Sequence, residues 1–130
     1  MIKKTTVETG RLGEAIAAKF LKKSGFKILE RNRHQSHNEL DLIAVNKEFL
    51  VFCEVKTRSV EKDLYSPYGT PASSVTRGKQ MRTIKAAQAY LTQTKHNEKQ
   101  PRFDVIEIFL DKETHKLLKL NHIPNAFGIK

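Results

Sequence analysis

Residues 39–56 read ELDLIAVNKEFLVFCEVK, and this stretch decides how the chain folds. Its two ends are rich in β-branched, aromatic and other apolar side chains, which is typical of strands in a half-buried sheet. Asn46 and Lys47, which lie between these ends, favour a tight turn. The stretch therefore predicts a β-hairpin with strands at residues 39–45 and 49–56.

Four charged side chains interrupt the apolar pattern of this hairpin. Glu39 and Asp41 are two residues apart on the first strand, and Glu54 and Lys56 are two apart on the second, so each pair shares a face. A two-residue turn sets Glu39 opposite Glu54 and Asp41 diagonal to Glu54, at about 7–8 Å backbone spacing. A three-residue turn puts the two pairs on opposite faces. A shared site therefore predicts a turn with an even number of residues.

Carboxylates gathered on one face repel one another unless a positive charge lies between them. Lys56 supplies one such charge, and a hard divalent cation such as Mg²⁺ is the other candidate. The cation would neutralise charge that develops on a phosphate, and Lys56 would orient or deprotonate the attacking water. The alternative is an ordinary ion pair of Glu54 and Lys56 at a solvated strand end. The hairpin thus indicates either a centre for phosphodiester hydrolysis or a plain surface pair.

The segments around the hairpin alternate between helical and strand periodicity. Gly25 is expected to end the first helix, and Pro124 to end the last strand. The order of helix, three strands, helix and two strands favours an α/β sandwich around one sheet, as a single domain over residues 1–130. The expected helices span residues 8–23 and run from a cap at Ser73 or Ser74 to about residue 94; the further strands span 26–31, 103–110 and 117–123, with loops at 32–38 and 57–71.

One acidic residue of the first helix is a further candidate ligand for this site. Glu14 lies at the edge of that helix's apolar stripe. From there it either reaches inward to the same metal or stays solvated, and its spacing leaves both alternatives open.

The charge of the chain indicates a polyanionic partner. Lys and Arg number 24 and Asp and Glu 14, which leaves a net charge of +10. Such an excess attracts nucleic acid, anionic lipid or acidic protein, and nucleic acid is the commonest of these partners. The alternative is that the lysines only keep the surface soluble. Because the basic residues are spread along the chain, a basic tail on a neutral domain is excluded.

The single cysteine and the apolar runs limit the protein class further. Cys53 is alone, which excludes an internal disulfide and a multi-cysteine zinc site, and its alternation away from Glu54 predicts a buried core thiol. The longest apolar run is residues 49–53, far below the ~20 residues that span a bilayer. No apolar stretch follows the first lysines, so we expect no signal peptide and a cytoplasmic protein without membrane contact.

Several short motifs are distributed along nearly the whole chain. They are Gly10-Arg-Leu-Gly-Glu14-Ala15, Arg31-Asn32, Glu39-Leu-Asp-Leu-Ile-Ala44, Val51-Phe-Cys-Glu-Val-Lys-Thr-Arg58, Lys79 with Ala86-Ala-Gln-Ala-Tyr-Leu91, Arg102-Phe-Asp-Val105 and Asn125-Ala-Phe127. These motifs resemble those of the YraN-like family of small bacterial proteins, which is similar to restriction-endonuclease-like nucleases, including archaeal Holliday-junction resolvases.

The resemblance implies an αβββαβ core with a mixed central sheet flanked by helices. It also implies Asp41 and Glu54 as ligands of Mg²⁺ or Mn²⁺, Lys56 as the catalytic lysine and Glu14 as the helical acid that completes the site. Two positions depart from the pattern: Leu40 replaces a common proline, and Asn38 stands where the family usually has Gly. Resolvase-like proteins are often dimers, so a homodimer is compatible with the resemblance.

The function that follows is a metal-dependent DNA endonuclease, a hydrolase of branched or structured DNA. The alternatives are a nucleic-acid-binding module of the same fold without turnover, and a basic interaction protein. Glu39 and Gln80 are expected beside the ligands, and His34 and His37 on the surface rather than on zinc. Candidate nucleic-acid contacts, each with a solvated or structural role as the alternative, are Arg33, Arg58, Tyr68, Arg77 and Lys79.

Overall fold

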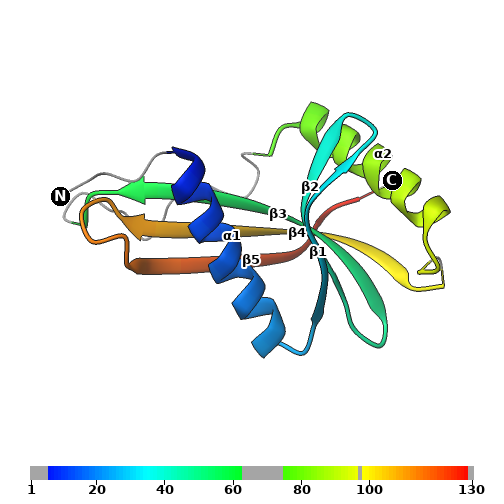
Figure 1. The fold of residues 1–130 in the computed structure, drawn as a ribbon, viewed down its shortest axis with the longest axis horizontal. Coiled ribbons are helices and arrows are strands. Elements are labelled where there is room, and N and C mark those ends of the chain that lie inside the picture. Colours follow the sequence, from blue (N-terminus) through cyan, green and yellow to red (C-terminus); the bar gives the residue numbers. More distant parts are fainter. Residues whose placement is uncertain (1–5, 63–74, 97, 129–130) are drawn as a thin grey trace.

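The central hairpin opens into one five-stranded sheet in a computed structural model that describes residues 6–62, 75–96 and 98–128. The elements follow the predicted order of helix, three strands, helix and two strands (Figure 1). They are α1 (Thr6–Lys23), β1 (Lys27–Gln35), β2 (Asn38–Val45), β3 (Phe49–Val60), α2 (Arg77–Gln93), β4 (Gln100–Asp111) and β5 (Leu117–Phe127).

The sheet is mixed, and its strands lie side by side in chain order. Neighbours pair antiparallel except β3 and β4, which are parallel over their full lengths. A parallel pair needs a crossover from one end of the sheet to the other, and α2 lies in that connection. The α/β fold class and the αβββαβ-like core are therefore confirmed, with β5 added beyond β4.

The two helices cover opposite faces of the sheet. Leu21 of α1 packs in a cluster with Leu42, Val51 and Ile106, whereas Ile84 of α2 packs with alternate residues of the same strands, including Phe52. Side chains alternate between faces along a strand, so one sheet serves two cores. Neither helix is long and apolar enough to cross a membrane, in the described part of the chain.

The hairpin between β2 and β3 has an even-numbered connection, as the shared site requires. Val45 pairs with Leu50, so four residues connect the strands, not two. The Asn46 side chain accepts hydrogen bonds from the backbone N–H groups of Glu48 and Phe49, at 3.0 and 2.7 Å, and closes the turn. The connection is even-numbered, as predicted, but the predicted register is wrong by two residues.

The loop predicted at residues 32–38 is wrong, because β1 continues to Gln35. Ser36 and His37 form a two-residue connection with φ values of 51° and 65°. Positive φ at both central residues is the conformation of a type I′ hairpin turn, whose twist matches the flanking strands. The polar side chains of this segment hid a second hairpin, in which Gln35 pairs with Asn38.

Three further boundaries differ from prediction. β3 runs to Val60, through the start of the loop predicted at 57–71, because β4 pairs with it over that length. α2 begins at Arg77 with Thr76 as its cap, whose hydroxyl accepts from the Lys79 N–H, and Ser73 and Ser74 lie outside the described residues. β5 continues past Pro124, since an edge strand tolerates a proline beside a bulge.

Candidate metal centre

The candidate site lies where β2 and β3 separate. Their pairing ends at Leu42 and Cys53, while β3 goes on beside β4. At this fork the N–H of Val55 donates to the Asp41 carboxylate at 3.0 Å. The carboxylate replaces the strand partner that β2 no longer supplies. Continuing the register by one residue sets Asp41 beside Glu54, and these two side chains share a hydrogen bond.

Helix α1 brings a third carboxylate to the fork. Oxygen atoms of Glu14, Glu39 and Asp41 all lie within 4.8 Å of one another. α1 approaches β3 closely here, because Gly13 leaves no room for a side chain: a Cβ at that position would lie 2.8 Å from the Thr57 Cβ. The fold therefore joins acids of two elements that are far apart in sequence.

Burial and mutual repulsion perturb these acids. Burial, together with the neighbouring Asp41 charge, raises the pKa of Glu54 to about 7, against the opposing charge of Lys79. The pKa of Asp41 is also raised, mainly by burial, although a hydrogen bond from Val55 opposes the shift. Burial and the charge of Asp41 raise the pKa of Glu14. All three groups bind protons more tightly than free carboxylates, because burial and their mutual repulsion outweigh the opposing charges and hydrogen bonds nearby.

The donor set fits a hard divalent cation. One oxygen of Glu14 is buried and has no hydrogen-bond partner among the described residues. Such an atom normally has a partner, and a cation would provide one. Mg²⁺ and Mn²⁺ prefer carboxylate oxygens together with water. Glu14, Glu39 and Asp41 are therefore the residues that would hold the ion, with Glu54 beside Asp41.

The acids face a cavity of about 550 Å³ on the α1 side of the fork. Asp41, Glu54 and Glu14 line it together with the hydroxyl-bearing Thr57 and Ser59 of β3. Gly10 of α1 lies at its wall, where a Cβ would meet nothing within 4 Å. The cavity is thus large enough to admit part of a polymer backbone as well as water.

The remaining predicted residues of β3, Lys56 and Arg58, alternate to the same face of that strand as Glu54, and neither of them lines the cavity. Lys56 is half-buried two residues after Glu54, and its charge lowers the pKa of Glu54 slightly. Arg58 alternates to the face opposite Thr57 and Ser59, so it lies away from the cavity wall that they form. Its Nε is buried and has no partner within the described residues.

The predicted residues of α2 and β1 are placed differently. Lys79 joins the site, with its Nζ 3.9 Å from the Glu54 carboxylate. Gln80 donates to the Val75 carbonyl at 2.9 Å and so fixes the start of α2, where Arg77 is exposed. Arg33 binds Glu30 at 2.7 Å and stacks on Tyr90, 5.3 Å from the ring centre. Tyr68 lies outside the described residues, and His34 and His37 are exposed, as predicted.

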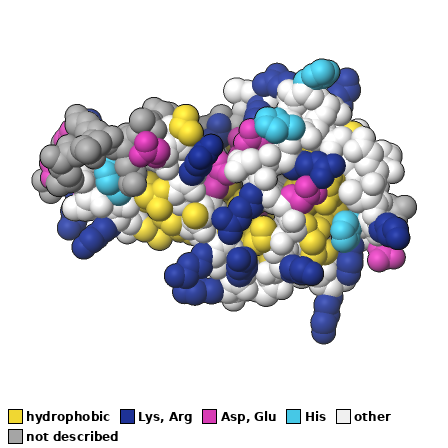
Figure 2. Space-filling view, viewed as in Figure 1, with side chains coloured by type: hydrophobic (Ala, Val, Ile, Leu, Met, Phe, Trp, Pro, Cys, Tyr) yellow, Lys and Arg dark blue, Asp and Glu magenta, His cyan; other side chains and the backbone are white. Residues whose placement is uncertain are grey.

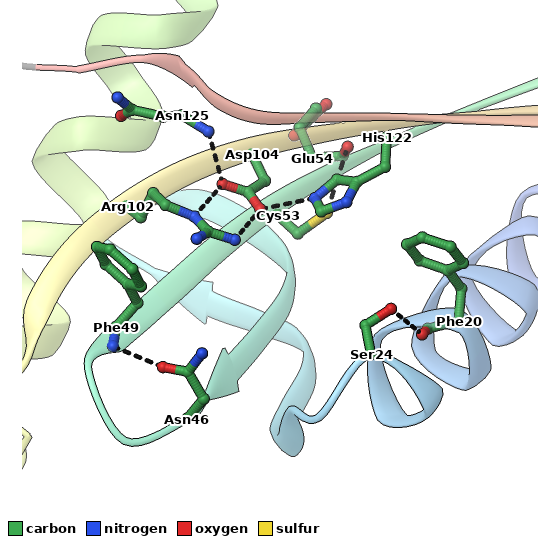
Figure 3. A network of polar contacts seen from close by, with 10 residues as sticks. All are labelled: Phe20, Ser24, Asn46, Phe49, Cys53, Glu54, Arg102, Asp104, His122 and Asn125. Atoms are coloured by element: carbon green, nitrogen blue, oxygen red, sulfur yellow. Dashed lines mark hydrogen bonds and ion pairs between the residues drawn. The ribbon is translucent and has the colours of Figure 1, made fainter.

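A buried network beside the fork was missed at the sequence level. Asp104 of β4 is fully buried and accepts from Arg102, from the Asn125 N–H at 3.0 Å, and binds His122 at 2.8 Å (Figure 3). Burial would raise the pKa of Asp104, but hydrogen bonds from His122 and Arg102 lower it overall. The network anchors β5 to β4. Only the motif Arg102-Phe-Asp-Val105 signalled it, because its members come from two strands.

Cys53 pairs in register with Asp104 and is 2% exposed. Burial and the nearby carboxylates raise the pKa of its thiol well above the usual value. A thiol that stays protonated is a poor nucleophile. The prediction of a buried core thiol is therefore confirmed.

Comparison with known proteins identifies similar chains. The sequence profile of Uncharacterised protein family UPF0102 matches residues 13–108. A UPF0102 protein of Caldanaerobacter subterraneus subsp. tengcongensis is 44% identical over 126 residues, which cover 97% of this chain and 98% of the relative. A UPF0102 protein of Chlorobium chlorochromatii is 42% identical over 129 residues, covering 97% and 95%. One of Clostridium perfringens is 41% identical over 128 residues, covering 98% and 100%.

Proposed function

We infer a function for this chain, which belongs to Uncharacterised protein family UPF0102, the YraN-like family expected from its motifs. We propose that it is a metal-dependent DNA endonuclease that acts on branched or structured DNA. The observation that carries this proposal is the carboxylate cluster of Glu14, Glu39 and Asp41, whose oxygen atoms lie within 4.8 Å of one another and of which Glu14 and Asp41 line a cavity in a basic protein. Carboxylates around a hard cation, within reach of a phosphate, are a standard arrangement for phosphodiester hydrolysis.

The residues of the fork have distinct proposed roles. Glu14, Glu39 and Asp41 hold the cation, which when bound would neutralise charge on the phosphate. Glu54 shares a hydrogen bond with Asp41 and keeps it oriented. Lys56 orients the water whose oxygen forms the new bond to phosphorus, as one phosphate ester bond breaks.

The charge distribution supports a nucleic-acid substrate. Lys and Arg side chains are spread over the face that carries α1, and the fewer acidic side chains lie in small groups between them (Figure 2). A basic surface binds the phosphate backbone without regard to sequence. The acids of the fork repel phosphate unless a cation is bound. In this proposal the basic surface therefore binds the DNA, and the acids with their cation act on the phosphate that is cleaved.

One contact favours a second candidate function, a nucleic-acid-binding module without turnover. Lys79 already places a positive charge 3.9 Å from Glu54. In such a module Lys79 would neutralise the acids permanently, and no cation would be required. The two candidates therefore differ in metal binding and in cleavage.

A cleavage assay separates the candidates. The protein is incubated with junction, flap, single-stranded and duplex DNA in the presence of Mg²⁺ or Mn²⁺. We expect cleavage of branched DNA by the native chain, and its loss in Lys56→Ala and Glu54→Ala. Lys85→Ala is the matched control for Lys56→Ala. Lys85 is an exposed lysine of α2, and its loss changes the net charge by the same amount as the loss of Lys56.

Two results would contradict the endonuclease proposal. One is cleavage that continues unchanged in Lys56→Ala and Glu54→Ala. The other is DNA binding with no products for any substrate and metal, which favours the binding module. Mn²⁺ titration of the native chain and of Asp41→Asn supplies a readout besides activity, since only an endonuclease site must bind the ion through Asp41.

A further inference from the structure

The cavity that holds the acids at one end holds a lysine and a histidine side chain at the other. Lys112 and His115, from the turn between β4 and β5, line the same cavity as Glu14 and Asp41. Neither residue was singled out by the sequence. The turn lies beside the last residue of β3, Val60. The Val60 carbonyl accepts a hydrogen bond from the Lys112 N–H at 2.9 Å.

The turn is held in one conformation by its own backbone. The N–H of His115 donates to the Asp111 carbonyl at 2.8 Å, and the N–H of Asp111 donates to the Lys116 carbonyl at 2.8 Å. His115 has a φ of 63°, in the left-handed region that few residues other than glycine occupy. This conformation fixes where the imidazole points.

The imidazole of His115 carries an unsatisfied polar atom. Its Nδ1 is buried and has no hydrogen-bond partner among the described residues. Buried ring nitrogens are nearly always paired, so the atom indicates a missing ligand or water. An imidazole N–H and a lysine ammonium are both donors, and an anion such as phosphate is the acceptor that they bind most strongly. Thr57 and Ser59 add hydroxyl donors along the wall towards the acids.

We propose that Lys112 and His115 form a phosphate-binding subsite for the DNA strand whose cleaved phosphate lies at the acids. This inference rests on the proposed function for its substrate. Five residues of β3 separate Glu54 from Ser59, which is about 17 Å of extended chain. Because a phosphate at that distance along the same strand is not adjacent to the cleaved one, the subsite contacts a phosphate a few nucleotides away from it.

The test compares two lysines of the same turn. Both lysines are exposed, but only Lys112 is among the described residues that line the cavity. Lys112→Ala and Lys116→Ala remove the same charge, so any general electrostatic effect is equal. Binding of fluorescent DNA is measured by anisotropy with Ca²⁺ in place of Mg²⁺. We expect about three- to tenfold weaker binding for Lys112→Ala only, with a salt slope smaller by about one.

The length of the DNA gives a second readout. The strand is shortened stepwise on either side of the branch point. The difference between Lys112→Ala and Lys116→Ala must vanish once the strand on one side is too short to reach from the acids to the subsite. His115→Asn, which tolerates the left-handed backbone, must show the same length dependence.

A measurement on the native chain does not depend on variant folding. Inorganic phosphate is titrated while the ring ¹⁵N resonances of His115 are followed by NMR. Saturable shifts at His115, with none at the exposed His37, support the subsite. Equal affinities of Lys112→Ala and Lys116→Ala on long DNA, or an unaffected His115 ring, overturn it even if the protein cleaves DNA. A Lys112 effect without any cleavage overturns the endonuclease proposal and leaves the subsite intact.

Discussion

At the scale of single residues, the pair of Asp41 and Glu54 determines the chemistry of the fork. The two side chains share one hydrogen bond, and the pKa of each is raised above its ordinary value, mainly by burial. Two neighbouring carboxylates cannot both ionise easily in a buried place. One proton therefore belongs to the pair when no cation is present.

This shared proton predicts how stability depends on pH. The pKa of Glu54 is about 7 in the folded chain, above its ordinary value of 4.5. The folded state therefore binds the proton more tightly than the unfolded state. Its contribution is present in full below pH ~4.5 and is lost as the pH rises through ~7, on the order of 3 kcal/mol. Urea midpoints in EDTA are expected to fall between pH 5 and pH 8.

Glu54→Gln is the control for this prediction. Gln keeps the shape and the donor but cannot ionise, so most of the fall between pH 5 and pH 8 should disappear. Asp104 does not confuse the result, because its lowered pKa acts only at more acidic pH. A native chain equally stable at both pH values, or an unchanged fall in Glu54→Gln, would show that Glu54 ionises normally.

At the scale of elements, the contact of α1 with β3 positions the helical acid. Gly13 faces Thr57 so closely that a Cβ would lie 2.8 Å from both Cβ and Cγ2 of Thr57, and closer still to its hydroxyl. Glu14 is the next residue of α1. The position of its carboxylate beside Asp41 therefore depends on the absence of a side chain at Gly13.

Two glycine variants in the same helix test this contact. Gly13→Ala should lower the free energy of unfolding by about 1–3 kcal/mol, because α1 must move away from β3. Gly10→Ala should instead add about 0.5–1 kcal/mol, since its Cβ meets nothing within 4 Å and alanine favours the helix. Denaturant unfolding measures both.

The same variants also test the metal centre. Mn²⁺ should bind less tightly to Gly13→Ala, because Glu14 moves with the helix, and with native affinity to Gly10→Ala. Thr57→Ser in the Gly13→Ala background removes one of the crowded atoms and should restore part of the stability. If Gly13→Ala is as stable as Gly10→Ala, the helix does not depend on this close approach.

At the scale of the whole molecule, a small acidic centre lies within a chain of net charge +10. The basic groups attract a polyanion over a distance, and the acids act only on what enters the cavity. DNA binding is therefore expected to weaken about a hundredfold between ~50 and ~200 mM salt, as for about four neutralised phosphates. Anisotropy titrations at several salt concentrations measure this slope.

Competition identifies the kind of partner. Unlabelled DNA should displace the probe, and anionic lipid vesicles or an acidic protein at equal charge should displace it less well. A flat salt dependence, or no DNA binding at moderate salt, would favour a basic interaction protein without a nucleic-acid role.

Local signals were enough for much of the molecule. The signals that predicted α1, β2 and β3 depend only on residues close together in the sequence. They are the apolar periodicity of α1, which ends before Gly25 with its φ of 96°, and the apolar runs of the two strands. Parity alone placed the acids on one face, because a side chain changes face at every residue. The boundaries that failed, at Gln35 and Val60, depend on partner strands. Pairing extends a strand through polar residues whose own preference is for a loop.

The sequence by itself determined the order of elements, the buried thiol and the identity of the candidate acids. Tertiary structure alone decided that β2 leaves β3 beside Asp41, that Glu14 meets Glu39 and Asp41, and that Lys112 and His115 share their cavity. The physical reason is distance along the chain. Periodicity records which face a residue occupies within its element, whereas the meeting of elements depends on packing between side chains that no local pattern encodes.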